Sequence, residues 1–116
     1  MSAPPLAAEP DPVDRTLAAL ADPARRRVVE LLREQPRRAG ELADALSVSP
    51  SVMSRHLKVL RDSQVVEETS PSFDARVRIY SLQAGATAGL RSWLDQVEQG
   101  WAEQLTALKA HVEGGP

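Results

Sequence analysis

Residues 47–62 read SVSPSVMSRHLKVLRD and combine a tight turn, a helix start and a helix with two unlike faces. Ser49 is a suitable N-cap because its hydroxyl can accept a free amide hydrogen of the first turn. Pro50 suits the first helical position, which needs no amide donor. Apolar side chains recur at i, i+4 and i+7 and predict one buried stripe, made of Met53, Leu57 and Leu60.

The other face of this predicted helix carries short hydroxyls and cations, at Ser51, Ser54, Arg55 and Lys58. These groups hydrogen-bond to phosphates and to base edges. Taken alone, an ordinary amphipathic helix with a solvated basic face explains the pattern better, because such helices are common. The flanking elements favour a DNA-reading helix.

Length and composition indicate one small domain. The chain has 116 residues, and its first twelve, MSAPPLAAEPDP, contain four prolines and little apolar periodicity. We therefore expect a disordered tail over residues 1–12, one domain over residues 13–112 and a flexible C-terminus over residues 113–116. A domain of this size buries proportionally little surface, so dimerisation would help to stabilise it.

The chain contains no cysteine, which excludes a disulfide, a thiolate metal site and a cysteine nucleophile. No apolar run approaches the length of a membrane span, and the N-terminus lacks the order of a signal peptide, so we expect a cytoplasmic protein. The net charge is −2, but residues 25–78 hold eleven Lys and Arg against eight Asp and Glu. This asymmetry fits a basic working surface with acidic flanks.

Three helices are expected before the central one. The first covers residues 11–21, with Asp11 or Asp14 at its N-terminus. Asp22-Pro23 starts the second, which runs to Glu34, and a short third helix covers Ala39–Leu46. The third helix, the connection 47–49 and the central helix together form a helix-turn-helix pattern.

Residues 25–27 are three consecutive arginines near the N-terminus of the second helix, the unfavourable end for cations. The sequence leaves open whether they are solvated, face phosphate or pair with an acidic helix.

Two segments rich in β-branched residues follow, Val65–Thr69 and Arg76–Leu82, with SPSFDA between them. In the second segment Val77 and Ile79 alternate with Arg76, Arg78 and Tyr80, which is the period of a half-exposed strand. We interpret the pair as a β-hairpin wing whose arginines reach phosphate or the minor groove. The alternative is a surface strand whose cations discourage edge pairing.

The last predicted helix covers Ala84–Val112 and carries an apolar stripe at spacings of three and four. Little apolar surface remains in so small a domain for this stripe to cover, so we expect it to meet a second copy of itself, although part of it would fold back on its own domain. The expected dimer interface contains Val13, Leu17, Leu90, Trp93, Leu94, Val97, Trp101, Leu105 and Leu108.

With its elements in this order, the chain resembles the ArsR-type winged-helix transcriptional regulators. The resemblance covers roughly residues 13–112 and rests on ADPARRRVVELL, GELADAL, SPSVMSRHLKVLRDSQVVE and RVRIYSL, with the spacing from Ser49 to Leu60 as its most specific part. It implies a mainly α fold with a small β-hairpin wing, dimerising through its terminal helices. It further implies a homodimeric bacterial regulator, usually a repressor, that leaves a palindromic operator when a signal arrives.

The resemblance also implies roles for single residues. The positions that meet bases are Ser51, Val52, Ser54 and Arg55. Positions that meet the DNA backbone or brace the helix are Ser49, His56, Lys58, Arg61, Arg76 and Arg78. His56 fits a packed, hydrogen-bonding neighbour better than a base reader.

Three positions depart from the family pattern. Gln64 stands where a glycine is usual, so it must adopt a left-handed conformation or end the helix differently. Arg38 replaces the serine or threonine expected before the third helix, which loses that cap. Asp74 takes the place of the usual glycine at the wing tip.

Metal-sensing relatives carry cysteines, or a histidine–carboxylate set on the final helix. Here Asp95, Glu98, His111 and Glu113 could form an intersubunit site, but the close Asp-x-His pair is absent because Val97 follows Asp95. We therefore expect the metal-free branch, with no cofactor and an unknown effector. A metal-responsive repressor and a protein-interaction module without DNA binding remain alternatives. An enzyme is not expected, since no nucleophile–base pair or phosphate-binding glycine loop is present.

Overall fold

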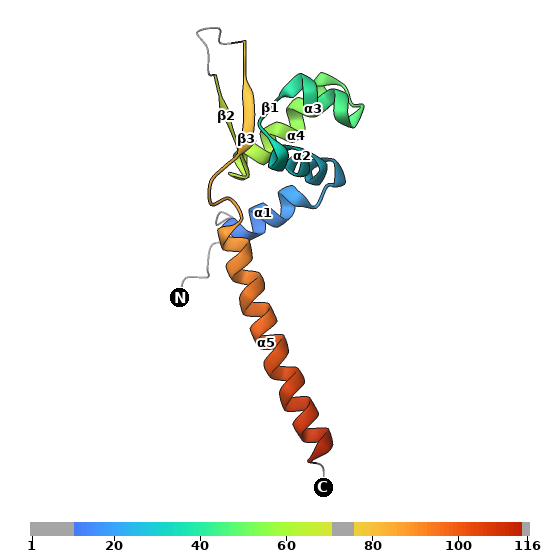
Figure 1. The fold of residues 1–116 in the computed structure, drawn as a ribbon, viewed down its shortest axis with the longest axis vertical. Helices are drawn as coiled ribbons and strands as arrows, with labels where there is room; N and C mark the ends of the chain where they lie inside the picture. Colours follow the sequence, from blue (N-terminus) through green and yellow to red (C-terminus); the bar gives the residue numbers. More distant parts are fainter. Residues whose placement is uncertain (1–10, 71–75, 115–116) are drawn as a thin grey trace, which may run out of the picture.

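The computed structural model describes residues 11–70 and 76–114, which form a winged body and a projecting C-terminal helix (Figure 1). The elements in chain order are α1 (Pro12–Leu20), α2 (Pro23–Glu34), β1 (Arg37–Arg38), α3 (Ala39–Leu46), α4 (Pro50–Asp62), β2 (Val66–Thr69), β3 (Ile79–Leu82) and α5 (Ala88–Glu113). This order confirms the predicted mainly α fold with a hairpin wing.

Side-chain caps begin three of the helices where the sequence predicts them. Asp11 accepts the amide hydrogen of Val13 at 2.8 Å, and Asp22 accepts that of Ala24 at 2.7 Å. Ser49 accepts the amide hydrogen of Val52 at 3.2 Å. In each case a proline occupies the first helical position, where its missing N–H costs nothing.

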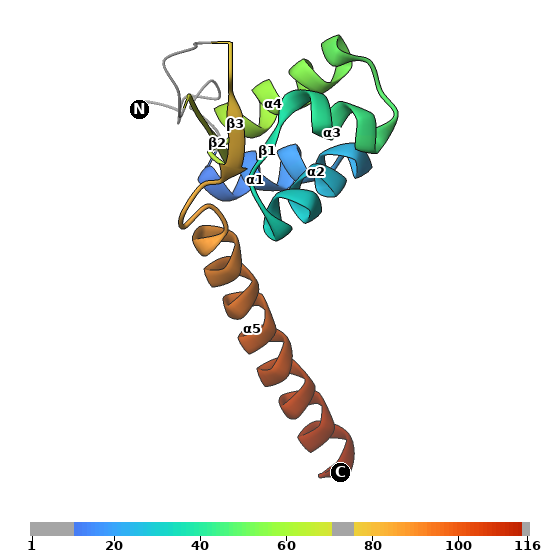
Figure 2. The ribbon, with the colours of Figure 1, turned by 45° about the horizontal axis from the view of Figure 1, so that its top comes forward.

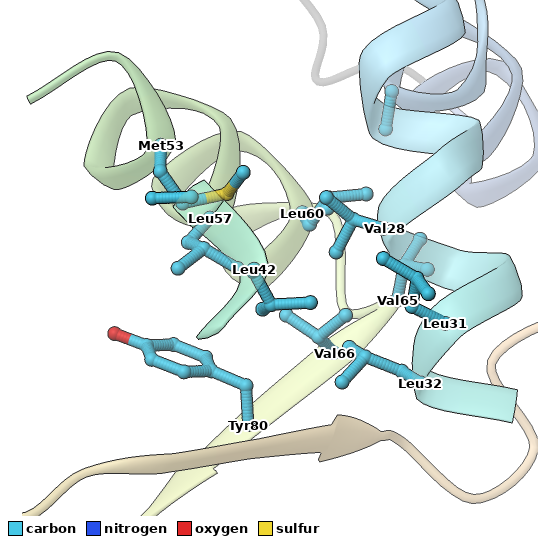
Figure 3. Close-up of a cluster of buried hydrophobic side chains, with 12 residues drawn as sticks. Val28, Leu31, Leu32, Leu42, Met53, Leu57, Leu60, Val65, Val66 and Tyr80 are labelled. Atoms are coloured by element: carbon cyan, nitrogen blue, oxygen red, sulfur yellow. The ribbon is translucent and has the colours of Figure 1, made fainter. Parts of the chain in front are cut away.

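The core lies where α2, α3 and α4 meet the sheet (Figure 3). α4 contributes the predicted stripe, and all three of its members are at most 2% exposed. The other large buried side chains are Val28, Leu31, Leu32, Leu42, Val65, Val66 and Tyr80. Each such side chain contributes roughly 1.5–3 kcal/mol through burial, so this cluster fixes how α4 is rotated in the body.

The sheet has three strands in the order β1-β3-β2, one more than the sequence predicts. β1 is a two-residue strand that pairs antiparallel with β3, placing Arg37 opposite Tyr80 and Arg38 opposite Ile79. So short a strand shows no periodicity, which explains why the sequence did not reveal it.

Strand β3 corrects two further expectations. It begins at Ile79, so Arg76 and Arg78 precede the strand. Tyr80 was assigned to the polar side, yet it is buried, because its ring joins the core while its hydroxyl reaches the carboxylate of Glu68. The predicted wing tip, with Asp74, lies outside the described residues.

The ends of the elements also shift by a few residues. α1 already includes Pro12 and is capped by Asp11, so the domain begins before residue 13, and the rest of the predicted tail lies outside the described ranges. α5 starts at Ala88 and not at Ala84, because residues 84–87 form turns around Gly85 at φ 76°. Glu113 belongs to α5. Gln64 adopts the predicted left-handed conformation, at φ 61°.

Helix α5 runs away from the body in both views and contacts α1 near its start (Figures 1 and 2). Its 26 residues include no buried one. Seven large apolar side chains of the helix are exposed, namely Trp93, Leu94, Val97, Trp101, Leu105, Leu108 and Val112. None of the described helices is long and apolar enough to cross a membrane.

Candidate nucleic-acid interface

The rotation of α4 determines which side chains it presents. Because Met53, Leu57 and Leu60 are locked in the core, the opposite face points outward. The predicted base readers Ser51, Ser54 and Arg55 are exposed on that face, while Val52 is half-buried. The hairpin β2–β3 lies beside α4 in both ribbon views (Figures 1 and 2), and α4 contacts β2.

Arg55 has the free functional group that a base reader needs. Within residues 11–70 and 76–114 its side chain makes no hydrogen bond and no ion pair. A guanidinium in this state can present two parallel N–H donors to a planar acceptor such as a guanine edge. Ser51 is more constrained, since its hydroxyl lies 3.3 Å from the hydroxyl of the capping Ser49.

The predicted backbone contacts on α4 are already paired within the protein. Lys58 bonds Asp62 at 2.9 Å, and both side chains are well exposed. An exposed pair of this kind contributes only about 0.3–0.5 kcal/mol, so Lys58 can exchange its partner for a phosphate. Ser49 is used as the N-cap of α4, and its hydroxyl hydrogen is available to an outside acceptor when Ser51 is the donor of the 3.3 Å hydrogen bond between the two hydroxyls.

Glu68 joins the end of α4 to the wing. Its carboxylate, largely buried, accepts hydrogen bonds from Arg61, from Arg78 at 2.9 Å and from the Tyr80 hydroxyl at 3.0 Å. Burial raises the pKa of Tyr80 above its ordinary value, and the hydrogen bond to Glu68 raises it further. Arg61 therefore braces the interface, as the sequence allowed. Glu68 itself was missed, since a glutamate on a strand carries no motif.

Two of the three arginines at the start of α2, Arg25 and Arg26, have a role that none of the three interpretations anticipated, while Arg27 lies on the solvated surface. The Arg25 side chain donates to the carbonyl of Ala19 at 2.6 Å, and Arg26 donates to that of Leu20 at 2.7 Å. These are terminal carbonyls of α1, where a cation also meets the negative end of the helix dipole. Arg27 pairs with Glu30 at 3.3 Å on the surface.

Arg25 also links α1 to α4. Its guanidinium lies 3.5 Å from Nδ1 of His56, which is half-buried on α4. The pKa of Asp22 is lowered, first by the amide hydrogen bond from Ala24 and then by the charges of Arg25 and His56. His56 is thus placed as a packed neighbour that positions α4.

A groove of about 530 Å³ separates the N-terminus of α3, the outer face of α4 and the segment leading into β3. Its lining combines one predicted base reader, Ser54, with two predicted backbone contacts, Arg76 and Arg78. Arg38 and Glu41 line the same groove, and sequence reasoning assigned neither of them to DNA. The positively charged part of the candidate interface therefore includes Arg38, which lies outside α4 and the wing.

Two expected dimer residues, Val13 and Leu90, are half-buried, while Leu17 is exposed on α1. Leu17 and Trp93 share a hollow of about 440 Å³ between α1 and α5. The rest of the predicted set lies exposed along α5.

The candidate metal ligands Asp95, Glu98, His111 and Glu113 lie on α5. No three His, Asp or Glu side chains lie close enough to hold an ion in the part of the chain that the structure describes. Asp95 and His111 both lie on α5. They are sixteen positions apart along the helix, roughly 24 Å, so Asp95 and Glu98 meet His111 and Glu113 only if a second chain brings them together.

Residues 22–68, from the cap of α2 into β2, match the family model of the bacterial regulatory proteins of the arsR family. The HTH-type transcriptional regulator Rv2034 of Mycobacterium tuberculosis is 40% identical over 100 residues, which cover 86% of this chain and 88% of that protein. The chain belongs to the ArsR family. It is a DNA-binding transcriptional regulator with a winged helix-turn-helix fold.

Two further proteins are also similar to this chain. The transcriptional repressor SdpR of Bacillus subtilis is 29% identical over 56 residues, 48% of this chain and 62% of that protein. The solution structure of a homodimeric winged helix-turn-helix DNA-binding domain from Mycobacterium bovis has a TM-score of 0.60 at 24% identity. It covers 77% of this chain and 80% of its own. That likeness supports the fold.

Proposed function

We propose that this ArsR-family regulator is a homodimeric repressor whose two α4 helices read a palindromic operator in successive major grooves. The outer face of α4 supports the DNA-reading part of this proposal. The buried stripe of α4 turns Ser51, Ser54 and Arg55 outward, and the Arg55 side chain has no partner among residues 11–70 and 76–114. In helix-turn-helix dimers the two half-sites lie about one helical turn, ~34 Å, apart.

The roles of single residues follow from their surroundings. Arg55 reads a guanine edge, Ser51 and Ser54 donate to or accept from bases, and the methyl groups of Val52 contact a thymine methyl. Ser49, Lys58, Arg76 and Arg78 hold phosphates. His56 and Arg61 act through their contacts with Arg25 and Glu68, which position α4 and the wing.

The stripe on α5 supports the dimer. Six of its members repeat with a period of eleven residues, since Leu90, Leu94 and Val97 are followed by Trp101, Leu105 and Leu108. A period of 11 residues in three turns is 3.67 per turn, slightly longer than that of a straight helix. The α5 helices of two protomers would therefore pack almost straight, with a slight right-handed twist. Homodimerisation in the Mycobacterium bovis domain agrees with this proposal.

The repressor role rests on family membership and on the likeness to the repressor SdpR. A repressor acts by occupying its operator, which needs affinity and specificity from the protein and no catalytic group.

The test is operator selection from random DNA, followed by gel shifts of two variants at two salt concentrations. Arg55→Ala should lower affinity for the selected operator while leaving affinity for unrelated DNA unchanged, because it removes base readout worth about 1–3 kcal/mol. Arg78→Ala should weaken binding to all sequences alike and reduce the salt dependence. Arg91→Ala, on exposed α5, serves as a charge-matched control.

If both variants lose only thermal stability and keep operator affinity, the assignment of the reading face is wrong. If the wild type shifts no DNA even at low salt, the fold acts as a protein-interaction module instead.

A further inference from the structure

Arg38 lines the groove between α3, α4 and the wing. Its side chain makes no hydrogen bond or ion pair that would stabilise the part of the fold that the structure describes. We propose that Arg38 binds a phosphodiester group of the operator backbone in this groove. The inference rests on the proposed DNA binding and adds a residue that neither the recognition helix nor the wing contains.

The position of Arg38 is fixed by its backbone. It pairs with Ile79 as part of β1, and it stands immediately before α3 as its N-cap. Its amide hydrogen bonds the carboxylate of Glu41 at 3.2 Å. Its side chain is exposed and makes no hydrogen bond or ion pair with any residue that the structure describes.

The neighbouring Arg37, by contrast, stabilises the fold through its side chain. Arg37 donates to the carbonyl of Leu31 at 3.2 Å and to Glu34 at 2.7 Å, so its guanidinium holds the end of α2. Arg38 makes no such contact. It also cannot cap α3, because a guanidinium has no acceptor atom, and a serine at this position would stabilise the helix better. Because Arg38 neither holds α2 nor caps α3, we infer that its side chain serves to bind a ligand.

The groove specifies the chemistry of that ligand. Its charged lining consists of three arginines, Arg38, Arg76 and Arg78, against one glutamate, Glu41. A guanidinium presents parallel N–H donors that match two phosphate oxygens. Ser54 of the reading face lines the same groove, so an anion bound there is adjacent to the bases that α4 reads. A backbone phosphate of the operator satisfies both conditions.

The decisive variant is Arg38→Ser, because the two roles predict opposite results for it. The serine supplies the capping hydroxyl that α3 lacks, so the melting temperature of the full-length protein should rise. Affinity for the selected operator should fall by about 3- to 10-fold, and the slope of log affinity against log salt should flatten by about 1.8, the value for two lost phosphate contacts, one in each half-site. Arg38→Ala should weaken DNA binding equally without raising the melting temperature.

A matched control is Arg33→Ala, which removes an exposed arginine from the last turn of α2, outside the groove. It should change neither affinity nor salt slope. Operators with a single methylphosphonate then locate the contact. One neutralised phosphate in each half-site should weaken wild-type binding but have no further effect on Arg38→Ser.

Unchanged operator affinity and salt slope in Arg38→Ser would overturn the proposal, while binding by the wild type would leave the proposed function standing. Failure of the wild type to bind any DNA would reject both. If the groove instead binds free phosphate, inorganic phosphate at constant ionic strength would raise the melting temperature of the wild type but not that of Arg38→Ser. Operator affinity would then be equal in the two proteins. That result would also contradict the proposal.

Discussion

The winged body and helix α5 use apolar side chains in opposite ways. In the body, α2, α3, α4 and β2 direct theirs into one cluster, where Leu60 is 0% exposed. On α5 an equally regular apolar stripe stays exposed, with Leu108 at 58% and Trp101 at 66%. The body is therefore complete within one chain, whereas the stripe of α5 stays uncovered unless a second chain packs against it, as we propose.

The largest effect is expected on the free energy of unfolding, when a leucine is shortened to alanine in the body or on α5. Leu60→Ala should lower the free energy of unfolding by about 2–5 kcal/mol at any protein concentration, because it leaves a cavity in the body. Leu108→Ala should cost stability only at concentrations where the protein is dimeric. Chemical denaturation at low and high protein concentration measures both. Equal, concentration-independent losses would show that α5 packs on its own body.

A charge placed in the stripe should separate the protomers. Leu108→Glu should convert the dimer to a monomer and weaken operator binding by about 100-fold, because the second half-site contact is no longer linked to the first. Ala110→Glu adds the same charge on the opposite face of α5 and should leave both properties unchanged. Sedimentation velocity and gel shifts provide the readout. Dissociation by both variants would indicate a general charge effect.

Both tryptophans lie on α5, so they would report directly on the proposed dimer interface. On dilution through the dimer dissociation constant, their fluorescence should shift to longer wavelength as the rings enter water, and the shift should be absent in Leu108→Glu.

A smaller effect is expected on the pKa of Tyr80, which reports on the contact between the wing and the body. Tyr80 is the only tyrosine, so the near-ultraviolet absorbance of tyrosinate reads its ionisation alone. The midpoint should lie above the ordinary tyrosine pKa, and Glu68→Gln should lower it toward that value, while Glu67→Gln on the same strand should not. A midpoint unaffected by Glu68→Gln would mean that this cluster does not hold the wing.

The same raised pKa predicts a loss of stability in alkali. The folded protein holds the phenol proton more tightly than the unfolded chain does, so this contribution is fully present below about pH 10 and is lost as the pH rises through the raised pKa. Tyr80→Phe should remove that part of the alkaline destabilisation.

The smallest effect concerns the end of α4. Gln64→Gly should stabilise the body by about 0.5–1 kcal/mol, because glycine adopts a positive φ without the strain of a side chain. Ser63→Gly, one residue earlier at φ −89°, should instead destabilise it. Thermal unfolding of the two variants gives the comparison, and a loss of stability in Gln64→Gly would contradict the assigned conformation.

The sequence predicted those parts of the fold that follow from local chemistry. Asp22-Pro23 and Ser49-Pro50 start helices wherever they occur, and the stripe of Met53, Leu57 and Leu60 determines the face of α4. Features that depend on tertiary contacts were missed. The strand β1 exists only because β3 lies beside it, and Arg25 caps a helix six residues upstream.

The candidate interface shows the same division. The exposed side chains of α4 follow from helical periodicity, so the candidate base readers could be named in advance. Glu68 and Arg38 could not, because each gains its significance from residues that the fold brings near, namely Arg61 and Arg78 for Glu68 and the groove beside Ser54 for Arg38.

Selection of binding sites from random DNA tests the central claim most directly. A dimer that reads DNA through two α4 helices should enrich an inverted repeat whose half-sites are centred about one helical turn, roughly 10 base pairs, apart. Arg55→Ala should lose the preference for that repeat. Enrichment of no sequence, or of a single half-site bound equally well by the monomeric Leu108→Glu, would contradict the account.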